Sequence, residues 1–183
     1  MYTGHLGIAL AAKGVQPSVP LWVFVAASQA CDWVDAAVWP FGHADLASGR
    51  WLVAGDWTAQ MASHSLPSVA GIAIVLFGLY YTATRDGRGA WLVAGVALSH
   101  VLADYITAEK PTWPGGPRIG LSLYHRPAAD FIVETAIVCS GWLLYHRSLP
   151  LGRSSTPAWL MLGALVALQL VANVTLRHAL GTY

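Results

Sequence analysis

His100 and Asp104 stand four residues apart inside an apolar stretch that runs from residue 91 to residue 106. In a helix this spacing places both side chains on the same face. Imidazole and carboxylate groups bind divalent metals, transfer protons and form hydrogen-bonded pairs. Ionisable groups are costly within a membrane-length apolar helix, so we expect both side chains to have partners elsewhere in the chain.

Five residues with metal-binding side chains interrupt the apolar segments of the chain: His5, Asp32, His64, His100 and Asp104. Their nitrogen and oxygen donors, with no thiolate among them, suit a divalent metal, which we expect to be zinc, with manganese or iron as alternatives. A bound cation would also keep the carboxylates ionised at membrane depth. Asp35 and Glu134 are the candidate catalytic residues, because a carboxylate near such an ion can act as a general base.

These residues also have interpretations without a metal. A histidine at the end of a span, such as His64, is commonly interfacial, and Asp35 could face the lipid headgroups. His100 and Asp104 could hold two helices together through a hydrogen bond. We favour a metal site because the candidate ligands converge at one depth of the predicted bundle.

The composition is that of an integral membrane protein. Of the 183 residues, 56% are hydrophobic and only 10% are charged, whereas about 25% are charged in a typical soluble domain. The mean hydropathy is +0.52. A formal net charge of +1 without basic runs offers no surface for nucleic acid, so we expect no nucleic-acid partner.

The apolar segments predict an all-α protein, a polytopic transmembrane helical bundle that forms one domain over residues 1–183. The segments long enough to cross a hydrocarbon core of about 30 Å are separated by turns that contain glycine and proline. The five predicted spans are 21–39, 64–84, 90–107, 127–145 and 157–176. Residues 3–13 form a shorter pattern, about 16 Å long at 1.5 Å per residue, which we interpret as an N-terminal half-helix.

The order of the spans places all candidate ligands near one face of the bundle. We call the face with the short turns at 14–20, 85–89 and 146–156 side A and the opposite face side B. Counting residues along each segment puts the five candidate ligands and Glu134 in the half nearest side B. The predicted loops 41–63 and 108–126 also fall on side B, and Trp51 and Trp57 in the first are candidate interfacial anchors. These positions predict one polar site that opens toward side B.

Several short motifs resemble one bacterial and archaeal family. They are Gly4-His5-Leu6-Gly7, Ser28-Gln29-Ala30-Cys31-Asp32, Ser63-His64-Ser65-Leu66, Leu98-Ser99-His100 with Asp104-Tyr105, and the proline- and glycine-rich loop 113–124. Together they are similar to the YdjM-type inner-membrane proteins, over most of the chain. The resemblance implies a membrane-bound, metal-dependent hydrolase of the bacterial inner membrane, in a family grouped distantly with zinc phospholipase C and P1-type nucleases. It also implies that the five candidate ligands match the family pattern position by position.

Two segments depart from that pattern. Residues 59–62 lack the basic or histidine residue that often precedes the His-Ser pair of the family. Residues 107–110 lack a histidine that many members carry after the position of Asp104. With fewer ligands, the site would hold one ion in place of several, or would no longer turn over. The resemblance therefore supports the metal site more strongly than the reaction.

The function that combines these observations is hydrolysis of a lipid-like ester or phosphoester at a metal site near one membrane face. The substrate would reach the site laterally from the membrane lipid or through the side B loops. The main alternative is a non-catalytic integral-membrane subunit, with other membrane subunits as partners and the polar cluster used structurally. A b-type haem protein, with two of the histidines as axial ligands, and an ion transporter are further alternatives.

Overall fold

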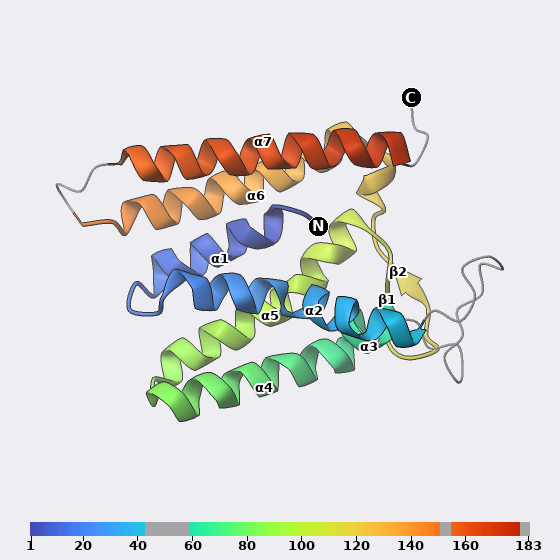
Figure 1. Cartoon of the computed structure of the whole chain (residues 1–183), viewed down its shortest axis with the longest axis horizontal. Coiled ribbons are helices and arrows are strands. Elements are labelled where there is room, and N and C mark those ends of the chain that lie inside the picture. The colour runs from blue at the N-terminus through green and yellow to red at the C-terminus, as the bar shows by residue number, and fades with distance from the viewer. Residues whose placement is uncertain (43–58, 151–154, 180–183) are drawn as a thin grey trace.

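The chain folds into a helical bundle, of which the computed structural model describes residues 1–42, 59–150 and 155–179 (Figure 1). The α-helices in these residues are Gly4–Val15 (α1), Leu21–Gly42 (α2), Ala59–His64 (α3), Leu66–Thr84 (α4), Gly87–Thr107 (α5), Pro127–Arg147 (α6) and Thr156–Ala179 (α7). Between α5 and α6 lie two short antiparallel strands, Lys110–Pro111 (β1) and Arg118–Ile119 (β2), and a 3₁₀ turn, Leu123–His125 (η1). The prediction of an all-α bundle is confirmed.

Among the described helices, five are long and apolar enough to cross a membrane, namely α2, α4, α5, α6 and α7. Their outer faces carry large exposed apolar side chains, including Trp22, Ile74, Trp91 and Leu160, as lipid-facing surfaces require. α1 has 12 residues and is therefore about 18 Å long, too short for a hydrocarbon core of about 30 Å. It is the half-helix that the sequence predicts.

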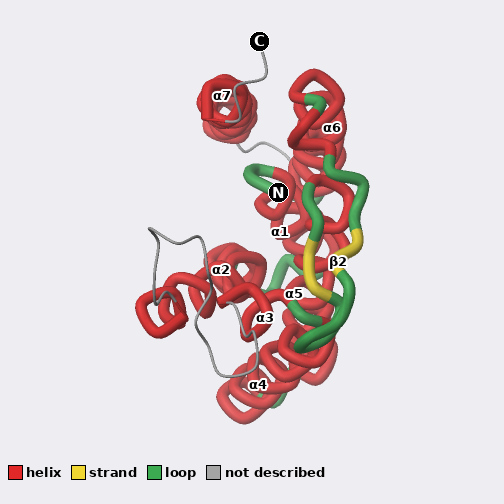
Figure 2. The backbone as a smooth tube through the Cα atoms, turned by 90° about the vertical axis from the view of Figure 1, so that its right-hand side faces the viewer, coloured by secondary structure: helices red, strands yellow, loops and turns green. Residues whose placement is uncertain are grey.

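The half-helix α1 lies in the middle of the bundle, with α6 on one side and α2 and α5 on the other (Figure 2). It buries His5, Gly7 and Leu10 among these neighbours. The connection from α1 to α2 and the turn from α4 to α5 lie at one end of the bundle, which is side A (Figure 1). The N-terminal end of α1 points toward the other half, where α3, the two strands and η1 lie. This placement brings His5 into the centre of side B.

Glycines allow α1 and α6 to pack with their backbones in close contact. A Cβ atom at Gly141 would overlap the carbonyl oxygen of Gly7, and one at Gly7 would lie 2.8 Å from the carbonyl oxygen of Ile137. Small residues commonly permit such close approach between membrane helices. Since α1 carries His5, this contact also sets the position of a candidate ligand.

We expect Gly141→Ala to destabilise the protein by about 1–3 kcal/mol, because the added methyl group forces α1 away from α6. Gly163→Ala on α7 is the matched control, since a Cβ at Gly163 meets nothing within 4 Å. Thermal unfolding of the detergent-purified proteins, followed by circular dichroism, measures the difference. Equal midpoints for the two variants would contradict this account of the packing.

The start of the second span differs from the prediction, because His64 ends α3 and α4 begins at Leu66. The intervening Ser65 is extended, with φ −72° and ψ 151°. Pro67 occupies the first turn of α4, where a backbone N–H would have no acceptor within the helix, so that its absence costs no hydrogen bond. The amide of Leu66 donates to the carbonyl oxygen of Thr112 at 2.9 Å. His64 is therefore held by a separate short helix and tied to the segment that follows α5.

The two predicted loops have different outcomes. Residues 43–58 of the first, with Trp51 and Trp57, lie outside the described residues. The second is more regular than predicted, because Lys110 pairs with Ile119 and Pro111 pairs with Arg118 in a small antiparallel sheet. The strands bring two basic side chains to the side B end of the bundle.

Candidate metal centre

Side chains from four helices meet at side B. His5 comes from α1, Asp32 from α2, His64 from α3, and His100 and Asp104 from α5. The three histidines and Asp104 are buried, whereas the Asp32 side chain is 45% exposed. The structure thus brings the five sequence-predicted ligands into one cluster and leaves one edge of it accessible.

His64 and His100 lie at distances from each other and from two aspartates that suit ligands of one tetrahedral ion. The Nε2 atom of His64 lies 3.2 Å from His100 Nε2, 3.3 Å from Asp32 Oδ1 and 3.4 Å from Asp104 Oδ2. The Nε2 atom of His100 lies 3.5 Å from Asp32 Oδ1 and 3.7 Å from Asp104 Oδ2. Two ligands bound at about 2.0–2.2 Å to a tetrahedral zinc ion are separated by roughly 3.3–3.6 Å. The donor set and its spacing therefore fit a divalent metal.

The hydrogen bonds of His100 define which of its nitrogens can bind a metal. Its Nδ1 atom lies 2.7 Å from the carbonyl oxygen of Ser28. A carbonyl oxygen only accepts hydrogen bonds, so Nδ1 carries the proton and, in the neutral ring, Nε2 carries the lone pair. The helix α2 thus orients His100 through its backbone, with the lone pair directed at the cluster.

Two hydrogen bonds in series orient His64 and define which of its nitrogens carries the proton. Ser63 Oγ donates to Asp35 Oδ1 at 3.0 Å and lies 2.6 Å from His64 Nδ1. Because the serine proton is used on Asp35, Ser63 Oγ accepts from the Nδ1–H group of His64, which leaves the lone pair on Nε2. Burial lowers the pKa of His64 and so favours this neutral ring. Asp35 therefore orients a ligand through Ser63.

The four facing atoms are consequently all electron-pair donors. The two imidazole Nε2 atoms lie 3.2 Å apart, and each lies 3.3–3.7 Å from an oxygen of both carboxylates. Such groups repel when no proton lies between them, and a cation turns this repulsion into attraction.

His5 packs against this set from α1. Its ring stacks on His100, with centroids 3.8 Å apart and planes 5° from parallel, and its Nε2 atom lies 3.1 Å from Asp104 Oδ1. Its Nδ1 atom is buried and has no hydrogen-bond partner among the described residues. His5, His100 and Asp104 form a second group with metal-ligand spacing, which shares His100 with the group of Asp32 and His64. His5 can thus orient Asp104 or act as a further ligand.

Sequence reasoning missed three contributors to the site, namely Lys110, Ser63 and the amine of Met1. Lys110 Nζ lies 3.3 Å from Asp104 Oδ2, with the lysine side chain only 12% exposed. Its position six residues after Asp104, at the end of a span, is the signal that could have indicated it. Ser63 stands directly before His64 in the Ser-His-Ser motif and contacts its Nδ1 atom, whereas Ser65 Oγ, directly after His64, donates to Ser68 Oγ. The amine nitrogen of Met1 also lies 2.5 Å from Asp104 Oδ1.

Glu134 is buried next to the N-terminal end of α1. Its Oε2 atom accepts hydrogen bonds from the amides of Tyr2 at 2.7 Å and Gly4 at 3.0 Å. Amides at the start of a helix have no partner within the helix, and the positive end of the helix dipole favours a carboxylate there. Its Oε1 atom has no partner among the described residues. In this part of the chain no hydrogen bond or ion pair joins Glu134 to the five candidate ligands.

The cluster geometry bears on the haem alternative. A haem needs its planar macrocycle between two axial imidazoles. Here His5 and His100 are in direct ring contact, and Asp32 and Asp104 oxygens occupy the space beside the facing nitrogens of His64 and His100. This packing favours a small ion.

Comparison with known proteins finds one family. A family model described as YdjM inner membrane protein matches residues 2–179. No curated protein and no solved structure matches the chain. The match covers every helix described above, including all five candidate ligands.

Proposed function

We propose that this chain, which belongs to the YdjM inner membrane protein family, is a metal-dependent hydrolase of a lipid-like ester or phosphoester. The family and the five candidate spans make it a multi-pass protein of the inner membrane. The observation that carries the proposal is the set of facing donor atoms in which the Nε2 atoms of His64 and His100 lie 3.2 Å apart and each lies 3.3–3.7 Å from an oxygen of Asp32 and of Asp104. Such a set, with nitrogen and oxygen ligands only, suits zinc, with manganese and iron as alternatives.

The residues of the cluster have distinct roles in this proposal. Asp32, His64, His100 and Asp104 hold the ion, and His5 supports Asp104 or adds a ligand. When bound, a divalent ion supplies Lewis-acid polarisation of an ester or phosphoryl oxygen and a lowered pKa for water. The half-exposed Asp32 marks the edge at which a substrate can approach.

Asp35 and Glu134 remain our candidates for proton transfer. Asp35 is joined to His64 through Ser63, so a proton can be held along this short chain. Glu134 keeps one buried oxygen, Oε1, without a partner in the described part of the chain. Asp35 contacts a candidate ligand through Ser63, and Glu134 contacts the amides of Tyr2 and Gly4 beside His5.

Metal analysis and turnover together test this proposal. We expect the detergent-purified protein, prepared without chelators, to contain about one equivalent of zinc, manganese or iron. Chelation should abolish hydrolysis of bis(p-nitrophenyl) phosphate or p-nitrophenyl butyrate, and the same metal should restore it. Turnover that is unchanged in chelated, metal-free protein would overturn the proposal.

A structural ion is the second candidate, and one observation favours it. Two histidines and two aspartates supply four donors, the number of protein ligands in structural zinc sites, whereas catalytic sites keep a position open. In that case the protein would be a non-catalytic membrane subunit. It would bind the metal and lose thermal stability on chelation, would show no turnover of either ester, and would co-purify with other membrane proteins in fixed stoichiometry.

A further inference from the structure

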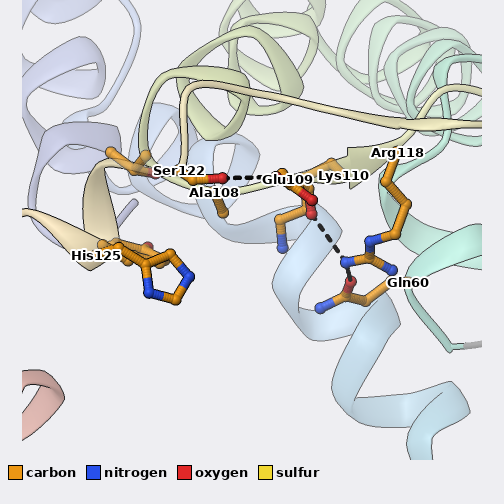
Figure 3. A pocket seen from close by; sticks show the side chains of 9 residues that line it. Gln60, Ala108, Glu109, Lys110, Arg118, Ser122 and His125 are labelled. Carbon is orange, nitrogen blue, oxygen red and sulfur yellow. Dashed lines mark hydrogen bonds between the residues drawn. The ribbon is translucent and has the colours of Figure 1, made fainter. Parts of the chain in front are cut away.

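A polar pocket of about 460 Å³ lies beside the metal cluster, over the C-terminal end of α5 (Figure 3). Its walls come from α3, β1, β2, η1 and the segment that joins α5 to β1. Its volume lies within the range of about 300–1,000 Å³ that is usual for small-molecule sites. None of the five candidate ligands lines it, so it is a separate space next to the proposed metal.

Lys110 connects the pocket to the cluster of candidate metal ligands. This residue lines the pocket, and its Nζ atom lies 3.3 Å from Asp104 Oδ2. Thr107, which also lines the pocket, stands three residues after Asp104 and so on the same face of α5. A group that contacts Lys110 in the pocket would therefore be separated from Asp104, a proposed metal ligand, only by the lysine side chain.

A second cation, Arg118, lines the pocket and is held by neutral acceptors. Its Nη2 atom donates to Gln60 Oε1 and to the backbone carbonyl oxygen of Glu109, both at 2.8 Å (Figure 3). Within the described residues no ion pair joins Arg118 to a carboxylate. These two bonds orient the guanidinium without neutralising its charge, and other N–H groups of the fork remain available.

The one carboxylate of the pocket has its own partner. Glu109 Oε1 accepts a hydrogen bond from Ser122 Oγ at 2.9 Å. Of the two cations of the pocket, Lys110 is paired with Asp104, which leaves Arg118 as the one without a carboxylate partner among the described residues. The exposed ring of His125 adds a further donor or acceptor on the side away from Arg118 (Figure 3). The charge of the Arg118 guanidinium is complementary to an anion.

We propose that this pocket binds a phosphate group of the substrate, with Lys110 and Arg118 as its cationic contacts. The proposal rests on the proposed hydrolase function and narrows its substrate to a phosphate-bearing molecule. A planar arginine fork and a lysine ammonium are the usual pair for a phosphate, while a neutral carboxylic ester needs neither. Lys110 would hold the phosphate against the edge of the metal cluster, and Arg118 would bind its outer oxygens.

Arg118→Gln tests the pocket without altering a proposed ligand, and Arg126→Gln is the matched control, because Arg126 is exposed on the same side but does not line the pocket. The first measurement is binding of inorganic phosphate to the detergent-purified protein by isothermal calorimetry. We expect Arg118→Gln to weaken it at least about tenfold at unchanged metal content, and Arg126→Gln to leave it unchanged. Arg118→Lys, which keeps the charge, should bind with intermediate affinity.

The second measurement is the KM for two phosphate-bearing substrates, phosphatidate in nanodiscs and soluble glycerol 1-phosphate. A KM raised about tenfold by Arg118→Gln for either one supports the proposal, and the substrate that responds shows whether the phosphate belongs to a lipid or to a soluble molecule. Phosphate affinity that is equal in the parent, Arg118→Gln and Arg126→Gln proteins would overturn it. Phosphate binding is measured without turnover, so the two proposals can fail separately. If the parent protein shows no hydrolysis but Arg118→Gln still weakens phosphate binding, the hydrolase function is refuted and the anion site is retained.

Discussion

Replacing His100 by alanine is expected to weaken metal binding more than about 100-fold and to abolish metal-dependent hydrolysis. His100 Nε2 faces His64 and both aspartates, and His100 belongs to both groups with metal-ligand spacing. Residues that only orient a ligand already contribute roughly 10–100-fold to metal affinity, so loss of the shared ligand should cost more. Metal content by elemental analysis and turnover of bis(p-nitrophenyl) phosphate measure the two effects.

His146→Ala is the matched control for this experiment. His146 lies on α6 and packs on Trp142, with ring centroids 4.8 Å apart. It lies near the side A end of the bundle, and its loss should change neither metal content nor turnover. Asp104→Asn is a second variant of nearly equal volume, which guards against misfolding of the alanine variant. Full metal content in folded His100→Ala and Asp104→Asn proteins would show that the cluster is not a metal site.

Replacing Glu134 by alanine is expected to destabilise the protein by about 2–5 kcal/mol, because the amides of Tyr2 and Gly4 lose a buried acceptor. The start of α1 would then be released, and with it His5, which is the next residue after Gly4. Metal affinity should fall in consequence. Thermal unfolding and metal titration measure both effects. Thr135→Ala is the control, since the Thr135 hydroxyl has no partner among the described residues.

Glu134→Gln separates the anchoring role of this residue from a catalytic one. Glutamine keeps an acceptor oxygen for the two amides, so most of the stability and the metal content should remain. An amide cannot take up a proton at neutral pH, and turnover should fall about 10²–10⁴-fold if Glu134 is a general acid or base. Unchanged turnover in a stable Glu134→Gln protein would restrict Glu134 to the anchoring of α1.

The arrangement of the spans follows from local properties of the sequence. Apolar runs of about 20 residues must cross the bilayer as helices, because their backbone groups have no other partners there. Counting along such helices correctly places His100 and Asp104 in the same half as Asp32, since the rise of 1.5 Å per residue is constant. The boundary at His64 was wrong, because hydropathy does not register the break that extended Ser65 introduces before Pro67.

The candidate site was predictable as a set of residues but not as an arrangement. Ionisable side chains within apolar segments are conspicuous, and this feature alone identified the five candidate ligands. The sequence does not show which groups orient these ligands, because the two residues of each contact are far apart in the chain. The bond from Ser63 to Asp35 spans 28 residues, and the contact of His100 with the Ser28 carbonyl spans 72. Lys110 and Arg118 were unremarkable in the sequence, since only the small sheet brings them to one pocket.

The sequence by itself therefore determined the number of spans, the half-helix and the depth of the polar residues, all of which depend on hydropathy and helical rise. Only the tertiary structure decided which nitrogen of His64 and His100 faces the cluster and that these two nitrogens lie within 3.7 Å of each other and of both aspartates. These features depend on how α2, α3 and α5 rotate and pack against one another. Helix rotation is set by contacts between residues far apart in the chain, and no local pattern records it.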